Sequence, residues 1–125
     1  MKFAKWIFRS AGILGLLVMI PLAFAEKTIE QIMPPAVSHP EFFYGFIFLN
    51  ACWQILYLVL STDPIRYRLI MIPSFLAKAS GVVALLWLYL QERISKQWTT
   101  TIAFDGICAI LFMVAFWVGK ESKNV

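Results

Sequence analysis

The chain has 125 residues, of which 61% are hydrophobic and 14% charged, and its formal net charge is +4. Soluble domains carry about 25% charged residues, so this chain has too little polar surface to cover itself in water and is predicted to be a membrane protein. Its basic residues flank apolar segments instead of clustering on one soluble face. That distribution is typical of membrane orientation and argues against nucleic acid as a partner.

Four apolar segments reach the length of roughly 20 residues that is needed to cross the hydrocarbon of a bilayer. We predict spans over residues 6–25, 42–61, 69–90 and 99–119. Each should be a helix, because lipid offers no partners for unpaired backbone groups. The predicted fold is therefore all-α: an integral membrane four-helix up-down bundle that uses residues 1–125 as a single transmembrane domain.

Lysine and arginine are distributed unevenly over the two ends of this predicted bundle. Three lie at one end, namely Lys27, Arg93 and Lys96. Seven lie at the other, namely Lys2, Lys5, Arg9, Arg66, Arg68, Lys120 and Lys123. Since basic residues are retained on the cytoplasmic side, the bias predicts that both termini are cytoplasmic.

The first segment also has features of a secretory signal. Its start is basic, an apolar run follows, and residues 23–25 read Ala-Phe-Ala before Glu26, which resembles a cleavage site. The apolar run is long for a signal, however, and Pro21 lies close to that site. Ala11 and Gly15 form a small-xxx-small pair suited to packing on another helix. We expect the segment to be retained as the first span.

The first loop, residues 26–41, contains a short apolar pattern. Ile29, Ile32 and Met33 share a helical face, which predicts a short helix on the membrane surface. Pro34 and Pro35 should end it.

The second loop begins with Asp63-Pro64, a typical turn opener. Arg66 and Arg68 follow at the predicted depth of the lipid headgroups. We expect these two side chains to meet anionic lipid or Asp63.

Lys78 and Asp105 are charged residues inside the third and fourth predicted spans. Such a residue costs roughly 2.5–3.5 kcal/mol on insertion scales, so it usually has a partner or a function. Counting along ideal helices places the two backbones roughly 9 Å apart in height, which leaves direct pairing open. A long lysine stem would cover part of that difference, and Asn50 or Gln54 would be able to bridge the rest.

Polar side chains in a membrane bundle turn inward, because lipid cannot satisfy them. Three helical faces are expected to converge on the charged pair; they contain Asn50, Gln54, Tyr57 and Ser61 in the second span, Ser74, Lys78 and Gly81 in the third, and Thr101, Asp105, Cys108 and Phe112 in the fourth. Pro73 is expected to kink the third span just before Lys78. Interhelical hydrogen bonding is the simpler interpretation of the second-span face.

The remaining chemistry-bearing residues do not form a recognisable catalytic or metal site. Cys52 and Cys108 lie in different spans and are interpreted as small apolar residues. His39, the single histidine, lies in a loop and is expected to be solvated. The sequence has no metal-ligand cluster, nucleophile–histidine arrangement or phosphate-binding glycine loop. We therefore predict no catalytic residue, no metal and no cofactor, and an enzyme is the least expected class.

Several motifs together resemble a known family. His39-Pro40-Glu41-Phe42-Phe43-Tyr44-Gly45 opens the second span, residues 62–68 read Thr-Asp-Pro-Ile-Arg-Tyr-Arg, and Lys78 and Asp105 precede Phe112. This order resembles the DoxX-like group of small four-span bacterial membrane proteins and covers nearly the whole chain. The resemblance implies a four-helix bundle in a bacterial cytoplasmic (inner) membrane. Some members of the group are linked to quinone-dependent sulfur oxidation, but no residue here is seen to carry that chemistry.

Three functions remain open at this point. The favoured hypothesis is a non-enzymatic module that binds a small amphiphile, a lipid or a quinone, around Lys78 and Asp105. The alternative is a structural or assembly subunit of a membrane complex, in which the charged pair only joins helices. A further alternative is a proton-coupled transporter that uses Asp105 and, having few spans, works as a homo-oligomer.

Overall fold

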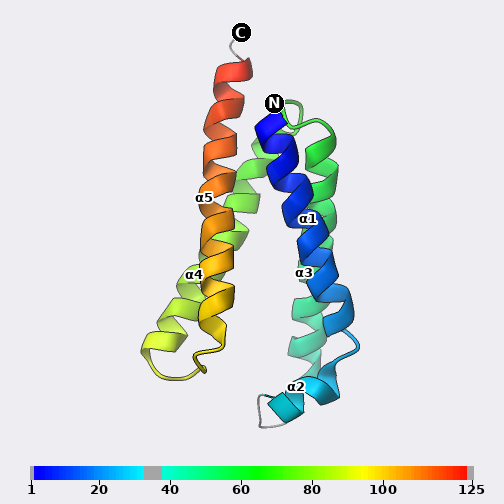
Figure 1. The fold of residues 1–125 in the computed structure, drawn as a ribbon, viewed down its shortest axis with the longest axis vertical. Coiled ribbons are helices and arrows are strands. Elements are labelled where there is room, and N and C mark those ends of the chain that lie inside the picture. Colours follow the sequence, from blue (N-terminus) through cyan, green and yellow to red (C-terminus); the bar gives the residue numbers. More distant parts are fainter. Residues whose placement is uncertain (1, 33–37, 124–125) are drawn as a thin grey trace.

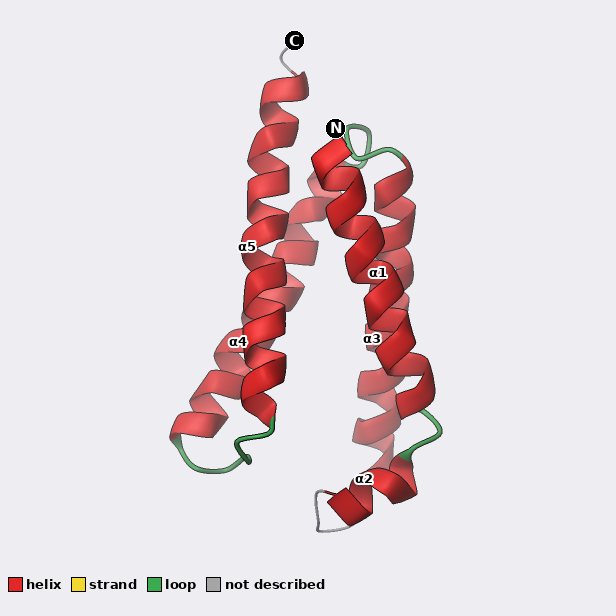
Figure 2. Ribbon diagram, viewed as in Figure 1, coloured by secondary structure: helices red, strands yellow, loops and turns green. Residues whose placement is uncertain are grey.

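The computed structural model describes residues 2–32 and 38–123 and contains no strand in these ranges (Figure 2). Its elements, in chain order, are α1 (Lys2–Leu22), α2 (Glu26–Ile32), α3 (Pro40–Thr62), the 3₁₀ turn η1 (Arg68–Ile70), α4 (Met71–Leu90) and α5 (Trp98–Lys123). Four helices are long and apolar enough to cross a membrane. The predicted all-α four-helix membrane bundle is confirmed.

The long helices are arranged as two antiparallel pairs. α1 packs on α3, α4 packs on α5, and α1 also contacts α5. Both chain termini lie at the same end of the bundle, which we call the terminal end (Figure 1). The two pairs approach each other there and diverge toward the opposite end, which we call the loop end (Figure 1). The helices therefore alternate up and down, as predicted.

The hydrophobic core joins the two pairs near the terminal end. Phe8 of α1 and Phe112 of α5 stack with ring centroids 4.3 Å apart, and Tyr57 of α3 meets Phe112 at 5.0 Å. Toward the loop end, Ile47 is the one described apolar side chain that is fully buried. The complete core cluster consists of Ala4, Phe8, Ala11, Tyr57, Leu60, Met71, Cys108, Phe112 and Ala115.

Small residues allow α1 to approach α3 closely. Ala11 is buried, and a Cβ atom on Gly12 would lie 2.8 Å from the backbone oxygen of Gln54. A Cβ atom on Gly15 would collide with the Gln54 side chain. The expected packing of the Ala11–Gly15 face on another helix is confirmed, and Gln54 is the residue that needs the space.

The start of α4 differs from the prediction. The third span opens with the 3₁₀ turn η1, so that Pro73 lies in the first turn of α4. The amide hydrogens of a first turn have no partner within the helix, so a proline there removes no essential bond. The position of Pro73 therefore gives no physical reason for the kink that was expected just before Lys78. Ser74 donates to the Ile70 carbonyl oxygen at 2.8 Å in the same turn.

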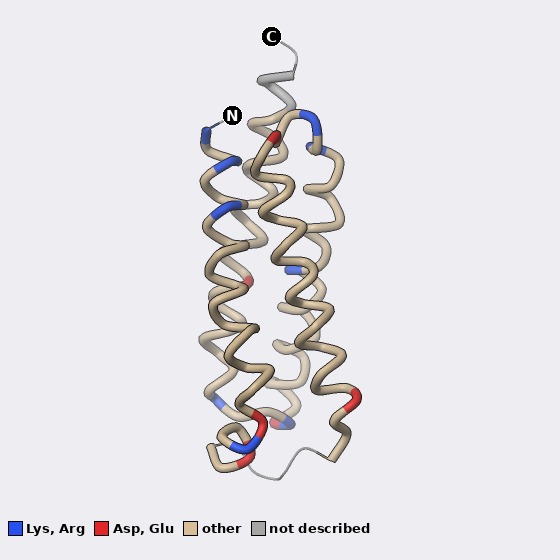
Figure 3. Tube along the Cα trace, turned by 90° about the vertical axis from the view of Figure 1, so that its right-hand side faces the viewer, with Lys and Arg blue, Asp and Glu red and all other residues tan. Residues whose placement is uncertain are grey.

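The short helix predicted in the first loop is present as α2. Ile29 and Ile32 belong to it, whereas Met33, Pro34 and Pro35 lie outside the described residues. The Tyr44 hydroxyl donates to Glu26 Oε2 at 2.6 Å and ties α2 to α3. Charged residues gather toward the two ends of the bundle, with few between them (Figure 3).

Candidate functional site

Lys78 of α4 and Asp105 of α5 are in direct contact. Lys78 Nζ lies 3.1 Å from Asp105 Oδ1, with geometry that makes the contact both an ion pair and a hydrogen bond. The lysine side chain is 12% exposed and the aspartate side chain 24% exposed. The pair joins adjacent helices without a bridging Asn50 or Gln54 side chain.

The height difference estimated from sequence assumed helices that run parallel. Figure 1 shows α4 inclined relative to α5, so that α4 covers less height along the bundle than its own length. Such an inclination reduces the expected height difference of roughly 9 Å, because that value was counted along helices parallel to the bundle axis. The four-methylene stem of Lys78 covers the remaining distance.

Aromatic rings surround the lysine ammonium. Its Nζ atom lies 5.8 Å from the ring centroid of Tyr57 and 5.9 Å from that of Phe104. Both distances fall in the range of cation–π attraction. Trp53 extends this wall, with its ring centroid 6.3 Å from that of Tyr57. Phe104 was not predicted as a site residue: it is apolar, and its position directly before Asp105 was the one available signal.

The pair leaves much of its hydrogen-bonding capacity unused. An ammonium group has three donors and a carboxylate has about four acceptor positions, yet one hydrogen bond joins Lys78 and Asp105. Across the described part of the chain, no other hydrogen bond reaches either group. The Tyr57 hydroxyl, in a residue that is 1% exposed, also lacks a hydrogen bond there. Three polar groups at one level of the bundle can therefore accept further partners.

The predicted polar face of α3 divides between two neighbours. Gln54 is buried and faces α1. Its Nε2 atom donates within α3 to the Asn50 carbonyl at 3.2 Å and to Asn50 Oδ1 at 3.1 Å. Ser61 donates to the Leu58 carbonyl of its own helix at 2.6 Å. Only Tyr57 of this face has a described contact with the ion pair. Gln54 Oε1 is buried without a hydrogen-bond partner among the described residues.

Two charged residues of the second loop, Asp63 and Arg68, make different kinds of contact. Asp63 Oδ1 accepts the Arg66 backbone N–H at 3.2 Å, which closes the expected turn. Arg68 turns inward to α5, where its Nε atom donates to the Phe116 carbonyl at 2.9 Å. The guanidinium carbon also lies 3.8 Å from the Phe116 ring centroid. Arg68 therefore fastens the loop to α5, a role that sequence could not show because its partner is a backbone carbonyl.

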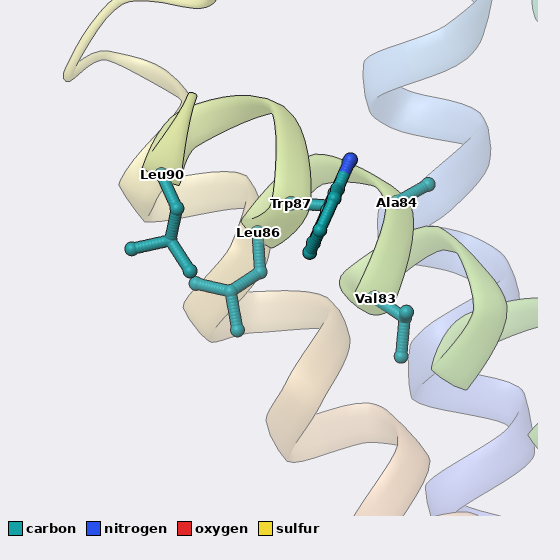
Figure 4. A pocket seen from close by; sticks show the side chains of 5 residues that line it. All are labelled: Val83, Ala84, Leu86, Trp87 and Leu90. Atoms are coloured by element: carbon teal, nitrogen blue, oxygen red, sulfur yellow. The ribbon is translucent and has the colours of Figure 1, made fainter. Parts of the chain in front are cut away.

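Two surface depressions of the described chain lie away from the ion pair. One is a shallow apolar depression on α4, lined by Val83, Ala84, Leu86, Trp87 and Leu90 (Figure 4). A second surrounds the α4–α5 connection, lined by Tyr89, Leu90, Glu92, Ile94, Ser95 and Lys96. Lys78 and Asp105 thus lie outside both depressions. The described residues include no group of three His, Cys, Asp or Glu side chains placed to hold a metal ion.

Comparisons with protein-family models, with curated proteins and with solved structures found no match. The likeness to the DoxX-like group therefore stays a prediction from short motifs, and function has to be argued from the site itself.

Proposed function

We propose that this multi-pass membrane protein is a non-enzymatic module that binds a small amphiphile, a lipid or a quinone, at the Lys78–Asp105 pair. The unused hydrogen-bonding capacity of Lys78, Asp105 and Tyr57 at membrane depth is the observation that carries the proposal. An unsatisfied polar group in hydrocarbon costs several kcal/mol. An oxygen-bearing head group would satisfy these groups in a place where bulk water is scarce.

Two glycines close to the ion pair in the sequence leave open surface on α4 and α5 for an apolar tail. A Cβ atom on Gly81 of α4 or on Gly106 of α5 would meet nothing within 4 Å. The amphiphile would therefore enter sideways from the bilayer with its head at the ion pair.

Ligand occupancy in native mass spectrometry tests the proposal. Protein extracted gently from its own membrane should carry a bound amphiphile, and the double variant Lys78→Met with Asp105→Leu should lose it. Ser80→Ala is the matched control, because Ser80 is an exposed polar residue of α4 whose hydroxyl bonds only to its own helix, at the Ala77 carbonyl. Unchanged occupancy in the double variant, with native helix content, would refute the proposal.

The second candidate function is a structural or assembly subunit, alone as a homo-oligomer or in a membrane complex. The short ion pair favours it, since the contact joins α4 to α5 directly at 3.1 Å. In this candidate the pair stabilises helix packing and binds no ligand.

Proton-coupled transport, the further alternative, would require Asp105 to leave Lys78 during the transport cycle. Reconstituted vesicles that acidify no faster than empty ones would exclude it.

We place the protein in a bacterial cytoplasmic (inner) membrane with both termini in the cytoplasm. The excess of Lys and Arg at the terminal end supports this orientation, and the motif resemblance supports the membrane. A cysteine-accessibility experiment on a residue added at each end, in cells, tests the orientation.

A further inference from the structure

We infer that the amphiphile is electrically neutral and carries a hydroxyl group beside a carbonyl or ether oxygen, as a diacylglycerol does. The inference rests on the proposed function, because it names the chemical class of ligand for the same site. Three properties of the site lead to it: its net charge, the spacing of its free polar groups and its aromatic wall.

The charge of the site is balanced before any ligand arrives. Lys78 and Asp105 carry opposite charges 3.1 Å apart. They are also the only Lys, Arg, Asp or Glu residues within α4 and the part of α5 that precedes Lys120. A phosphate-bearing head group would add an uncompensated negative charge beside Asp105 in a region of low dielectric constant, where such a charge is costly. A neutral head group adds none.

The free groups of the site call for a donor and an acceptor on neighbouring atoms. The remaining N–H groups of Lys78 need an acceptor, whereas the free oxygen of Asp105 needs a donor. Because the two side chains are in contact, one head group can meet both only if its own donor and acceptor are close together. A hydroxyl beside an ester oxygen has this arrangement. A quinone has two carbonyl acceptors and no donor, so it would leave the free oxygen of Asp105 without a hydrogen bond.

Tyr57 extends the same pattern. Its hydroxyl is both a donor and an acceptor, and its ring lies 5.8 Å from Lys78 Nζ. Together with Phe104 it gives the head group apolar flanks, which suit glycerol and acyl-ester carbon atoms better than a hydrated phosphate. The side chains that hold the lysine therefore also favour an uncharged ligand.

A competition experiment tests this inference. Purified protein is mixed with equimolar 1,2-dioleoylglycerol, dioleoyl-phosphatidylglycerol and a decyl-substituted benzoquinone, and the bound masses are compared by native mass spectrometry. The expected result is at least fivefold more dioleoylglycerol bound than either competitor. Equal or greater binding of phosphatidylglycerol or benzoquinone would overturn the inference while leaving the proposed function intact. Binding of none of the three above the level of the Lys78→Met with Asp105→Leu variant would overturn both.

A charge variant provides a second, independent readout. Asp105→Asn keeps the size and polar character of the side chain but leaves the site with a net positive charge. The bound fraction of phosphatidylglycerol should then rise at least fivefold relative to dioleoylglycerol, whereas Ser80→Ala should leave the ratio unchanged. A folded Asp105→Asn protein with the wild-type ratio would contradict the charge argument. The wild-type competition needs no variant, so it decides the inference even where Asp105→Asn does not fold.

Discussion

Removal of both charges of the Lys78–Asp105 pair should destabilise the protein less than removal of either one. The pair joins α4 to α5 through a contact of 3.1 Å, and its side chains are only 12% and 24% exposed. Lys78→Met leaves a lone carboxylate at membrane depth, and Asp105→Leu leaves a lone ammonium. A lone buried charge has lost its partner but keeps its desolvation cost. The double variant buries neither charge.

The magnitude follows from the contact distance. With an effective dielectric constant of about 20, unit charges 3.1 Å apart attract by roughly 5 kcal/mol. Desolvation of both groups and ordering of the lysine stem offset part of that attraction. Breaking a buried pair costs about 3–5 kcal/mol, and partial exposure places this pair at the lower end of that range. We expect each single variant to lose about 3 kcal/mol and the double variant about 1 kcal/mol or less.

Reversible unfolding in mixed micelles measures these differences, with helix content followed by circular dichroism as the denaturing detergent is increased. The control cycle combines Lys78→Met with Ser80→Ala; the Ser80 hydroxyl hydrogen-bonds to the Ala77 carbonyl and not to the ion pair, so this cycle should be close to additive. If the Lys78–Asp105 cycle is equally additive, the two charges are not coupled, and this would refute the prediction. Single variants as stable as the wild type would refute it as well.

Three further predictions test the rest of the fold by the same unfolding measurement. Gly15→Ala should destabilise the protein by about 1–3 kcal/mol, because the added methyl group collides with Gln54. Gly81→Ala should instead stabilise it by up to about 1 kcal/mol, because the methyl group meets open space there. A loss in both or in neither would contradict the packing. Arg68→Lys should cost about 1–2 kcal/mol, since an ammonium cannot reproduce the combination of a 2.9 Å hydrogen bond and a stacked guanidinium; an unchanged midpoint would show that the contact contributes nothing. Glu92→Gly should stabilise by about 1 kcal/mol, because φ at this position is 58° and glycine adopts that conformation without strain; a loss would show that the glutamate side chain compensates for it.

The spans were predictable from sequence because the need to satisfy backbone groups in lipid dictates helices. The prediction of 42–61 compares with Pro40–Thr62 in the structure, where Pro40 occupies the first turn and suits it. Helix ends were less predictable. The first helix ends at Leu22, before Ala23 and Phe24 turn the chain through hydrogen bonds to carbonyls of the preceding turn. Hydropathy cannot mark such an end, because the apolar run continues through it.

The site was predictable in its charges but not in its surroundings. Opposite charges in successive spans pointed to Lys78 and Asp105, since few alternatives stabilise either residue in lipid. The polar face of α3 was harder, because Gln54 and Tyr57 lie three positions apart and thus about 60° apart around the helix axis. On a helix with two neighbours, that angle is enough to direct Gln54 to α1 and Tyr57 to the ion pair. Only the packing arrangement decides which residue faces which neighbour.

Tyr57 links the stability of the bundle to the candidate site. Its ring contacts Phe8 and Phe112 in the cluster that joins the two helix pairs. The same ring lies 5.8 Å from Lys78 Nζ. The two pairs approach each other at the terminal end and diverge toward the loop end (Figure 1). A head group bound at the Lys78–Asp105 pair therefore also changes the environment of Tyr57, and through it the contact between the two pairs. Binding and helix-pair separation are thus expected to be thermodynamically coupled, because they act on the same aromatic side chain.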